Sequence, residues 1–137
     1  MSFSGVKVAP ECLEAFQELK LGKNLRYIVF KMNDTKTEII VDKKSTDKDF
    51  DTFLGELPEQ DCRYAVYDFE YNLGEGLRNK IVFISWSPDV SPIKSKMVYS
   101  SSKDTLRRAF TGITTDIQGT DFSEVSHEAV MEKVTRK

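Results

Sequence analysis

One stretch of the chain combines apolar and basic side chains in a pattern that suits binding to another protein. Residues 91–110 read SPIKSKMVYSSSKDTLRRAF, which predicts a helix capped by Ser91 with Pro92 at its first position. Ile93 and Met97 are four residues apart, so they lie side by side on the face opposite the expected core. Around them we expect small and charged side chains: Ser100, Ser101, Lys94, Lys96, Asp104, Arg107 and Arg108. The core side is expected to hold Val98, Leu106, Ala109 and Phe110, with Tyr99 at its edge.

Two interpretations of the outer face follow from these residues. In the first, Ile93 packs under the preceding loop SPDV and Met97 is one of the scattered exposed apolar side chains common in soluble proteins. In the second, the apolar centre enters a groove on a partner, to which methionine adapts well. The serines would then allow close approach, and the basic side chains would meet an acidic partner surface. The residues alone leave both interpretations open.

Signals for catalysis are weak. Asp68 and Glu70 alternate on a predicted strand and are expected on its solvent side rather than as a catalytic carboxylate pair. His127 is expected at the surface, without a serine or cysteine that the sequence places beside it. The segment LGEGLRN lacks both the phosphate-loop and the dinucleotide pattern. We therefore expect a protein that is not an enzyme.

Composition narrows the functional class further. A chain of 137 residues is most simply one domain, spanning 1–137, and its formal charge of −2 argues against general nucleic-acid binding. It contains no apolar run long enough to cross a bilayer, and its beginning, MSFSGVKVAP, does not resemble a secretory signal. We expect a cytosolic protein in which Cys12 and Cys62 are reduced and packed. With His127 far away in sequence, these cysteines make a poor zinc signal.

The elements that must position the outer face alternate between helix and strand along the chain. Residues 10–22 predict a helix bearing Leu13, Phe16 and Leu19 that stops at Gly22. The remaining elements are a hairpin of 25–32 and 37–42 around the turn NDTK, a helix in 46–57 presenting Phe50, Phe53 and Leu54, strands 62–71 and 80–86, and a short strand in 111–119. Asp121 and Glu124 then suit a capping box that opens a final helix bearing Val125, Ala129, Val130 and Val134. This alternation predicts an α/β fold, a mixed sheet with helices on both faces.

Several of these segments together resemble the ADF/cofilin family of actin-depolymerising proteins, and its fungal members most closely. The resemblance rests on SGVKVAPE, NLRYIVFKMNDTKTEIIVD, DCRYAVYDFEY, KIVFISWSPD, PIKSKMVYSSSKDTLRRAF and GTDFSEV, in that order along nearly the whole chain. It implies a single ADF-homology domain with a central sheet of about five strands. It also implies binding to actin monomers and filaments with preference for ADP-actin, altered filament twist, severing and depolymerisation. No cofactor is implied, since the nucleotide belongs to actin.

The resemblance assigns roles to individual residues. For binding to both monomer and filament it implies Ser4, Gly5, Val6, Ile93, Lys94, Lys96, Met97, Lys103, Asp104, Arg107 and Arg108. For a second, filament-specific surface it implies Arg78, Lys80, Glu132, Lys133 and Arg136. Taken singly, each of these charges would be interpreted as an ordinary solvated side chain. Anionic phosphoinositides are expected to compete with actin for Lys94, Lys96, Lys103, Arg107 and Arg108.

The resemblance also bears on regulation and location. Ser4 is a candidate phosphorylation site within residues 1–8, which we expect to be flexible. We expect a monomer in the cytoplasm on the actin cytoskeleton, without membrane insertion, cooperating with other actin regulators; nuclear entry stays open. Two alternatives are a glia-maturation-factor-like regulator of the Arp2/3 complex and a phosphoinositide-binding module with weak actin binding.

Overall fold

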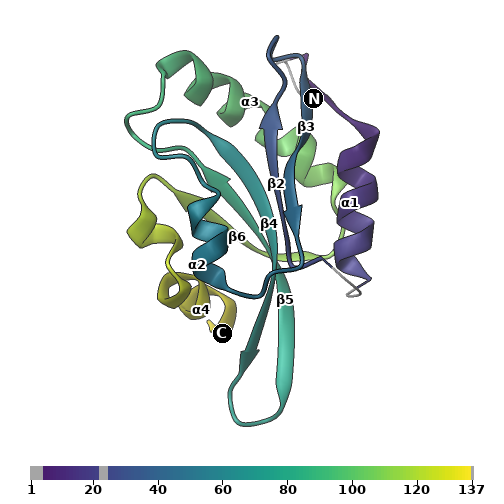
Figure 1. Cartoon of the computed structure of the whole chain (residues 1–137), viewed down its shortest axis with the longest axis vertical. Helices are drawn as coiled ribbons and strands as arrows, with labels where there is room; N and C mark the ends of the chain where they lie inside the picture. The colour runs from purple at the N-terminus through teal and green to yellow at the C-terminus, as the bar shows by residue number, and fades with distance from the viewer. Residues whose placement is uncertain (1–4, 22–24, 137) are drawn as a thin grey trace.

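The computed structural model describes residues 5–21 and 25–136 (Figure 1). Predictions that concern Ser4 and Gly22 lie outside these residues. The elements in chain order are β1 (Lys7–Val8), α1 (Pro10–Lys20), β2 (Tyr27–Met32), β3 (Glu38–Ser45), α2 (Phe50–Gly55), β4 (Arg63–Asn72), β5 (Leu77–Trp86), α3 (Ile93–Ala109), β6 (Ile113–Gly119), the 3₁₀ turn η1 (Phe122–Val125) and α4 (His127–Thr135). No helix within the described residues has the length and apolar character needed to cross a lipid bilayer.

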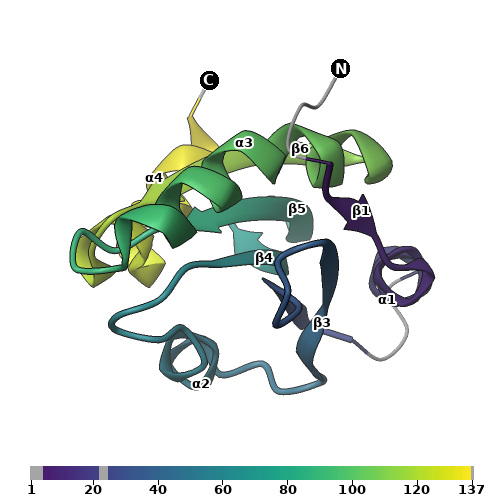
Figure 2. The same ribbon diagram turned by 90° about the horizontal axis from the view of Figure 1, so that it is seen from above.

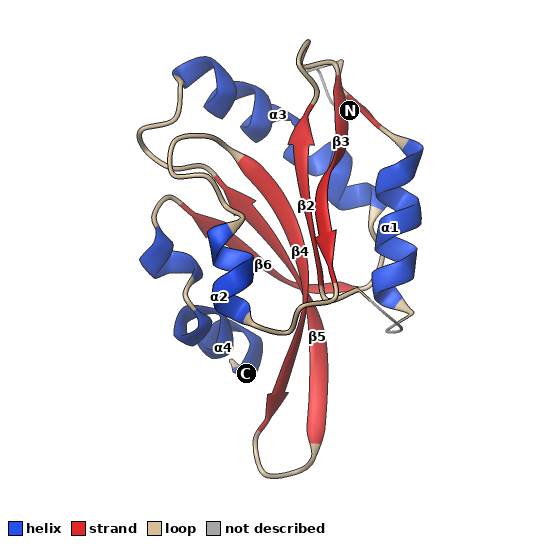
Figure 3. Cartoon of the chain, in the orientation of Figure 1, coloured by secondary structure: helices blue, strands red, loops and turns tan. Residues whose placement is uncertain are grey.

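The strands form one mixed sheet in the order β1-β3-β2-β4-β5-β6 (Figure 3). The central pairs β2–β3, β2–β4 and β4–β5 are antiparallel, whereas β1–β3 and β5–β6 are parallel. This confirms the predicted α/β architecture, and the two-residue β1 makes a sixth strand beside the five expected. Because β5 and β6 are parallel, the chain must cross over between them, and α3 is that crossover.

Each face of the sheet is covered by its own hydrophobic core. Along β4, Tyr64 and Val66 point into the core beneath α1 and α3, while Ala65 and Tyr67 point into the core beneath α2 and α4. Successive strand residues point to opposite faces, so a continuous apolar run serves both cores. Figure 2 shows α2 and α3 on opposite sides of the sheet. The prediction that YAVY and IVFI lie on doubly covered strands is therefore confirmed.

In α1 the buried stripe differs slightly from the predicted one. Phe16 and Leu19 are buried as expected, but Leu13 is exposed, and Cys12 and Ala15 complete the buried face. The helical period is matched more closely by the buried residues 12, 15, 16 and 19 than by the predicted stripe of residues 13, 16 and 19.

The beginning of α3 corrects the predicted cap. The N-cap residue is Pro92, whose extended backbone (φ −55°, ψ 139°) precedes Ile93, and no side chain caps the helix. Ser91 donates its N–H to Pro88 O at 2.9 Å in a turn, and its buried hydroxyl has no partner in the described structure. The turn at residues 88–91 therefore directs the Ser91 side chain inward, away from the helix end.

The buried face of α3 is also more polar than predicted. Its buried residues are Ser95, Tyr99, Ser102 and Leu106, while Val98 and Ala109 are half-buried. Tyr99 therefore lies at the centre of the buried face rather than at its edge. Small serines let the helix backbone approach the sheet, and the phenol ring fills the space between them.

The C-terminal segment corrects a second cap. Asp121 accepts hydrogen bonds from the N–H groups of Ser123 and Glu124, but it opens η1, not α4. Glu124 accepts from the N–H and hydroxyl of Thr120 instead of returning to Asp121. The final helix is capped by Ser126, whose hydroxyl accepts from Ala129 N–H at 3.1 Å. The predicted capping box thus orders the turn before the helix.

The β4–β5 hairpin extends past the other strands (Figure 1). β2 pairs with β4 only as far as Tyr67, whereas the two hairpin strands remain paired to Asn72 and Leu77. At the base of the hairpin, Asp68 is buried and accepts a hydrogen bond from the Asn79 amide at 2.7 Å. The prediction that Asp68 lies on the solvent side is wrong, because this cross-strand bond allows its carboxylate to be buried.

Candidate functional site

The outer face of α3 forms the helix surface, which consists of Ile93, Lys94, Lys96, Met97, Ser100, Ser101, Lys103, Asp104, Arg107 and Arg108. Its apolar centre is open to solvent, since Ile93 is 73% exposed and Met97 is 67% exposed. Ile93 therefore does not pack under the SPDV loop. The two side chains line one shallow depression with Lys96, Ser100 and Ser101. An exposed apolar centre surrounded by a polar rim is typical of a protein-binding surface.

The basic side chains around this centre differ in how far the protein itself uses them. In the described part of the chain, no ion pair or hydrogen bond engages the side chains of Lys94 or Arg108. Lys96 donates its ammonium to Asp89 O at 2.9 Å, which joins α3 to the loop before it. Arg107 forms a two-pronged pair with Asp116 on β6, at 2.8 and 3.2 Å. Lys94 and Arg108 are thus the free cations among these four, and Lys96 and Arg107 have structural partners.

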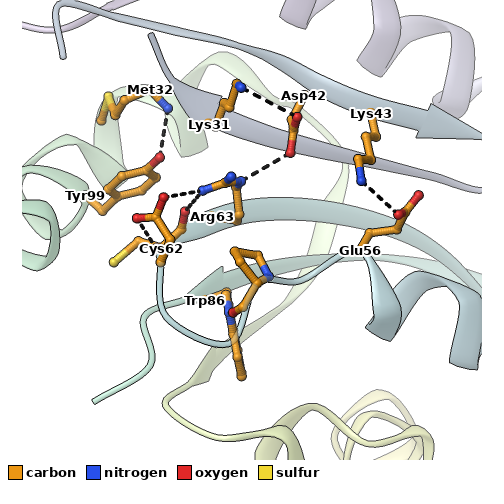
Figure 4. Close-up of polar contacts among 11 residues, drawn as sticks. Lys31, Met32, Asp42, Lys43, Glu56, Cys62, Arg63, Trp86 and Tyr99 are labelled. Atoms are coloured by element: carbon orange, nitrogen blue, oxygen red, sulfur yellow. Dashed lines mark hydrogen bonds and ion pairs between the residues drawn. The ribbon is translucent and has the colours of Figure 1, made fainter. Parts of the chain in front are cut away.

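Buried hydrogen bonds hold the helix surface in place. The Tyr99 hydroxyl accepts from Met32 N–H at 2.8 Å (Figure 4). The Tyr99 carbonyl accepts from the Tyr64 hydroxyl. Burial raises the pKa of both phenols above the ordinary value, so both remain neutral. These bonds join α3 to two strands across the core. The apolar centre is therefore carried on a rigid support.

Beside this contact lies a chain of charges on the neighbouring strands. Arg63 is held between Asp42 at 3.2 Å and Asp61 at 2.9 Å, and Lys31 lies 3.8 Å from Asp42 (Figure 4). These ion pairs satisfy the guanidinium where it leaves the core. They explain why a largely buried arginine is tolerated there.

The N-terminal residues lie against the same helix. β1 contacts α3, Gly5 is exposed with φ +73°, and Val6 is buried in the core beneath α1 and α3. Gly5 suits this conformation because a side chain is strained at positive φ. Of the three N-terminal residues singled out by the sequence, the structure thus exposes Gly5, buries Val6 and does not describe Ser4.

The hairpin surface consists of Arg78, Lys80, Glu132, Lys133 and Arg136. Arg78 is exposed on β5 opposite Tyr71. Lys80 donates its ammonium to Val134 O at 2.8 Å, in the last turn of α4. This bond brings the hairpin and α4 together and places a cation where the helix dipole favours one.

The α4 side of the hairpin surface is fully solvated. Glu132 and Arg136 pair with each other at 2.7 Å and lie one helical turn apart, and Lys133 is exposed beside them. Such an exposed pair contributes only a few tenths of a kcal/mol. These charges are therefore free to exchange partners.

The remaining chemical candidates are used structurally. Glu70 pairs with Arg26 at 3.2 Å, and His127 is exposed against the rings of Phe50 and Phe69. Burial, with the charge of Glu11, raises the pKa of the Cys12 thiol to about 12. No group of potential metal ligands occurs within residues 5–21 and 25–136. Glu70, His127 and Cys12 thus each have a structural contact among the described residues, and for Cys12 it includes a hydrogen bond from the thiol to Ile39 O at 3.3 Å.

Some exposed apolar side chains were not predicted from the sequence. Leu73 and Leu77 flank the hairpin turn and are exposed, as is Val90 in the loop before α3. The sequence could have predicted the exposure of Leu73 and Leu77, because these leucines flank the glycine-rich turn LGEGL. No sequence pattern indicated that Val90 is exposed, because its exposure follows from the turn at residues 88–91.

Comparisons with known proteins agree over nearly the whole chain. The model of a family described as cofilin/tropomyosin-type actin-binding protein matches residues 5–135. The cofilin of Schizosaccharomyces pombe is 87% identical over 137 residues, covering 100% of both chains. The cofilin of Saccharomyces cerevisiae is 61% identical over 138 residues, covering 99% of this chain and 96% of the relative.

Solved structures give the same result for the fold. The crystal structure of Streptomyces griseoflavus cofilin superposes with a TM-score of 0.93 at 56% identity, covering 96% of this chain and 98% of the other. The solution structure of ADF/cofilin from Trypanosoma brucei superposes with a TM-score of 0.79 at 37% identity, covering 98% and 97%.

Proposed function

The chain belongs to the cofilin/tropomyosin-type actin-binding family, and from this premise we propose that it binds actin monomers and filaments and depolymerises and severs the filaments. The observation that carries the proposal is the solvent-exposed pair Ile93 and Met97, held rigidly inside a basic rim. Burial of such an exposed apolar pair by a partner contributes favourable binding free energy. The protein acts by binding, without catalysis.

The helix surface is proposed to contact both monomeric and filamentous actin. Ile93 and Met97 enter an apolar cleft on actin, where burial of the two side chains supplies the binding free energy. Lys94 and Arg108 meet the acidic actin surface directly because neither has an internal partner in the described chain. Lys96, Lys103, Asp104 and Arg107 contribute at the rim.

The N-terminal segment is proposed to lie against the same actin subunit. Gly5 is exposed two residues before β1, and β1 contacts α3, which supports this placement for Ser4 and Gly5. Val6 anchors the segment from the core side. Phosphorylation of Ser4 would add negative charge next to basic side chains that actin needs.

The hairpin surface is proposed to grip a second subunit that only the filament offers. Arg78 and the α4 charges Glu132, Lys133 and Arg136 are exposed, and Arg78 belongs to β5 of the protruding hairpin (Figure 1). Contact with two subunits lets the protein favour a differently twisted filament, because differential affinity shifts the population toward that state. Filaments then break where twisted and normal segments meet. The same proposal includes a preference of this protein for ADP-actin.

A phosphoinositide head group is proposed to compete for the helix surface. Lys94, Lys96, Lys103, Arg107 and Arg108 form a local cation cluster on a chain of net charge −2. Such a cluster attracts anionic lipid by its local potential. The protein is proposed to act on the cytoplasmic actin cytoskeleton, together with other actin regulators; nuclear entry stays a prediction.

A filament pelleting assay without lipid, combined with microscopy of single filaments, tests the proposal. We expect co-sedimentation with actin filaments, visible breakage and a rise in unpelleted actin. An Arp2/3 regulator would bind the Arp2/3 complex and leave filaments intact. A phosphoinositide-binding module would co-sediment only weakly with filaments in this lipid-free assay, so either result would replace the proposed function.

A further inference from the structure

A small polar pocket lies between the β2–β3 turn, the start of β4 and the inner side of α3. Its volume is about 190 Å³, and its walls include Arg63 on β4 and Ser95 and Tyr99 on α3. This volume is below the range of pockets that hold a drug-sized molecule, so the pocket suits one small chemical group. None of the residues of the helix surface or the hairpin surface lines it.

Two buried hydroxyl groups in the pocket wall have a proton to donate. Tyr99 is 6% exposed and accepts the N–H of Met32, which leaves its own hydroxyl proton without an acceptor in residues 5–21 and 25–136. Ser95 is 8% exposed, and its hydroxyl bonds to no group in the same part of the chain. A buried hydroxyl without a partner costs free energy. The pocket therefore favours a ligand that accepts hydrogen bonds.

Two cations of the pocket also keep donors in reserve. Arg63 donates from Nε to Asp42 at 3.2 Å and from Nη1 to Asp61 at 2.9 Å and Cys62 O at 2.7 Å (Figure 4). Its other terminal nitrogen, Nη2, has no partner among the residues that the structure describes. The Lys31 ammonium lies 3.8 Å from Asp42, which is beyond hydrogen-bond distance. Both side chains are thus held in place with N–H groups left for a ligand.

The third cation, Lys36, is held in an uncommon backbone conformation beside the pocket. Its φ is +57°, a left-handed value that costs free energy in a residue with a side chain. Asn33 fixes this turn, because its side-chain oxygen accepts from Thr37 N–H at 2.9 Å and from Glu38 N–H at 3.2 Å. Lys36 is exposed, and its ammonium has no ion-pair partner within the described chain. The turn therefore presents a free ammonium to the pocket.

Carboxylates nearby limit the charge of the site. Both oxygens of Asp61 are already engaged, by Cys62 N–H at 2.8 Å and by Arg63 at 2.9 Å. Asp34 is exposed on the turn, and Asp42 lies behind the pocket against Arg63. The charges are close to balanced, whereas hydrogen-bond donors are in excess. Recognition in this pocket therefore depends on hydrogen bonds more than on net charge.

We propose that this pocket binds a single phosphate-sized oxyanion, with free inorganic phosphate as its ligand. The hydroxyls of Ser95 and Tyr99 and Nη2 of Arg63 donate to three of its oxygens, and the lysine ammonium groups approach from the open side. Donors from a strand, a turn and a helix surround a tetrahedral group. A planar carboxylate is matched best by both prongs of an arginine, and Arg63 has only one nitrogen free.

The lining of the pocket distinguishes free phosphate from larger phosphate compounds. Met32 is the single aliphatic residue that lines it, so the organic part of a phosphate ester finds little apolar surface there. A phosphoinositide head group carries several phosphates on a ring and is too large for this volume. Its proposed position stays the helix surface.

Nuclear magnetic resonance of the isotope-labelled full chain tests the proposal directly. Inorganic phosphate is titrated at neutral pH against sodium chloride of equal ionic strength. We expect the N–H signals of Met32 and Lys36 to shift saturably with phosphate alone, with a midpoint on the order of 1–10 mM. N-acetyl-phosphoserine amide, a phosphate monoester, should bind at least about fivefold more weakly. Inositol trisphosphate should shift the signals of Lys94 and Arg108 instead.

Variants of the protein locate the interaction. Ser95→Ala and Lys36→Asn should each weaken phosphate binding about fivefold, as loss of one hydrogen bond to a charged group does. Asparagine tolerates the left-handed conformation, so Lys36→Asn preserves the turn. Arg63→Lys should weaken binding about tenfold, and urea unfolding reports whether its fold is kept. Lys48→Asn removes an exposed lysine outside the pocket and is the matched control, with normal phosphate binding expected.

Several results would overturn the proposal. Equal shifts with sodium chloride would show an effect of ionic strength alone. Unchanged phosphate affinity in both Ser95→Ala and Lys36→Asn, or a loss in Lys48→Asn as large as theirs, would place the phosphate elsewhere. Equal or tighter binding of the phosphoserine compound, or displacement of phosphate by inositol trisphosphate, would remove free phosphate as the ligand. Filament pelleting by the unmodified protein is independent of all these outcomes.

Discussion

The helix surface and the hairpin surface use the same residue types in different ways. On the helix surface the apolar pair Ile93 and Met97 is exposed, and α3 beneath it is joined to two strands by buried tyrosine hydrogen bonds. On the hairpin surface Lys80 is itself the connection, through its 2.8 Å bond to Val134 O. A charged side chain on α3 that has no internal partner can bind another protein without affecting the fold. Lys80 joins β5 to α4, so it contributes to the stability of the fold as well.

The largest effect should come from breaking the helix surface. Lys94→Ala with Lys96→Ala should weaken monomer and filament binding at least about 100-fold, because two charges facing an acidic partner together contribute a few kcal/mol. Affinity is measured by fluorescence titration of monomers and by pelleting. Lys94→Ala alone separates the partner contact from the Lys96–Asp89 bond, and Met97→Asp should be as harmful as the double substitution. Near-normal monomer affinity in the folded double variant would contradict the assignment.

The next effect distinguishes the two surfaces. Arg78→Ala with Lys80→Ala should weaken filament binding and severing about tenfold and spare monomer binding, since only the filament has the second subunit. Lys80→Ala alone should also lower the free energy of unfolding by about 0.3–1 kcal/mol, because the end of α4 loses its cation. Arg78→Ala, with no stability effect expected, is the control. An equal fall in monomer affinity would merge the two surfaces into one.

A smaller effect is expected at the N-terminal edge of the helix surface. Ser4→Asp should weaken monomer binding about three- to fivefold at low salt, through repulsion from acidic actin, whereas Ser4→Ala should bind normally. The difference should shrink at high salt because partly exposed charges are screened. Equal affinity of the two variants at low salt would remove Ser4 from the surface.

Two neighbouring arginines offer a finer comparison within the helix surface. Arg108→Ala should weaken monomer binding about threefold, since Arg108 is exposed and unpaired in the described chain. Arg107→Ala should weaken it less, because the pair with Asp116 already holds that guanidinium. Both affinities are obtained by the same monomer titration. The reverse order would show that Arg107 exchanges Asp116 for actin.

The smallest effect concerns the supports beneath the surfaces and appears only at alkaline pH. Burial raises the pKa of Cys12 from 9.0 to about 12 and of Tyr67 from 10.0 to about 12. The folded state thus favours the protonated groups, and this contribution is complete below pH 9 and is lost as pH rises toward 12. Urea unfolding at about pH 8 and about pH 10.5 should show lower stability at the higher pH. Cys12→Ala and Tyr67→Phe should each reduce that pH dependence, and an unchanged dependence in both variants would show that burial of these two groups is not its cause.

The fold was predictable because its elements have strong local patterns. Apolar runs in β4 and β5 and the turn NDTK identify the central strands, and residue spacing identifies the exposed pair on α3. Features that depend on distant partners were not predictable. Asp68 is buried because Asn79 reaches it from the partner strand of the hairpin, and Lys80 meets Val134 from far along the chain. Tertiary contacts, rather than local sequence propensity, determine where these side chains lie.

The parallel pairing of β5 and β6 also sets an order of events during synthesis. The hairpins β2–β3 and β4–β5 pair between neighbours in the chain, so they can close as soon as they leave the ribosome. α3 follows both hairpins in the chain, and its buried hydrogen bonds go to β2 and β4, so the strands that hold it are made before it is. β6 and α4 come after α3. The helix surface can therefore form before the chain is complete, whereas the hairpin surface needs α4, the last element of the chain.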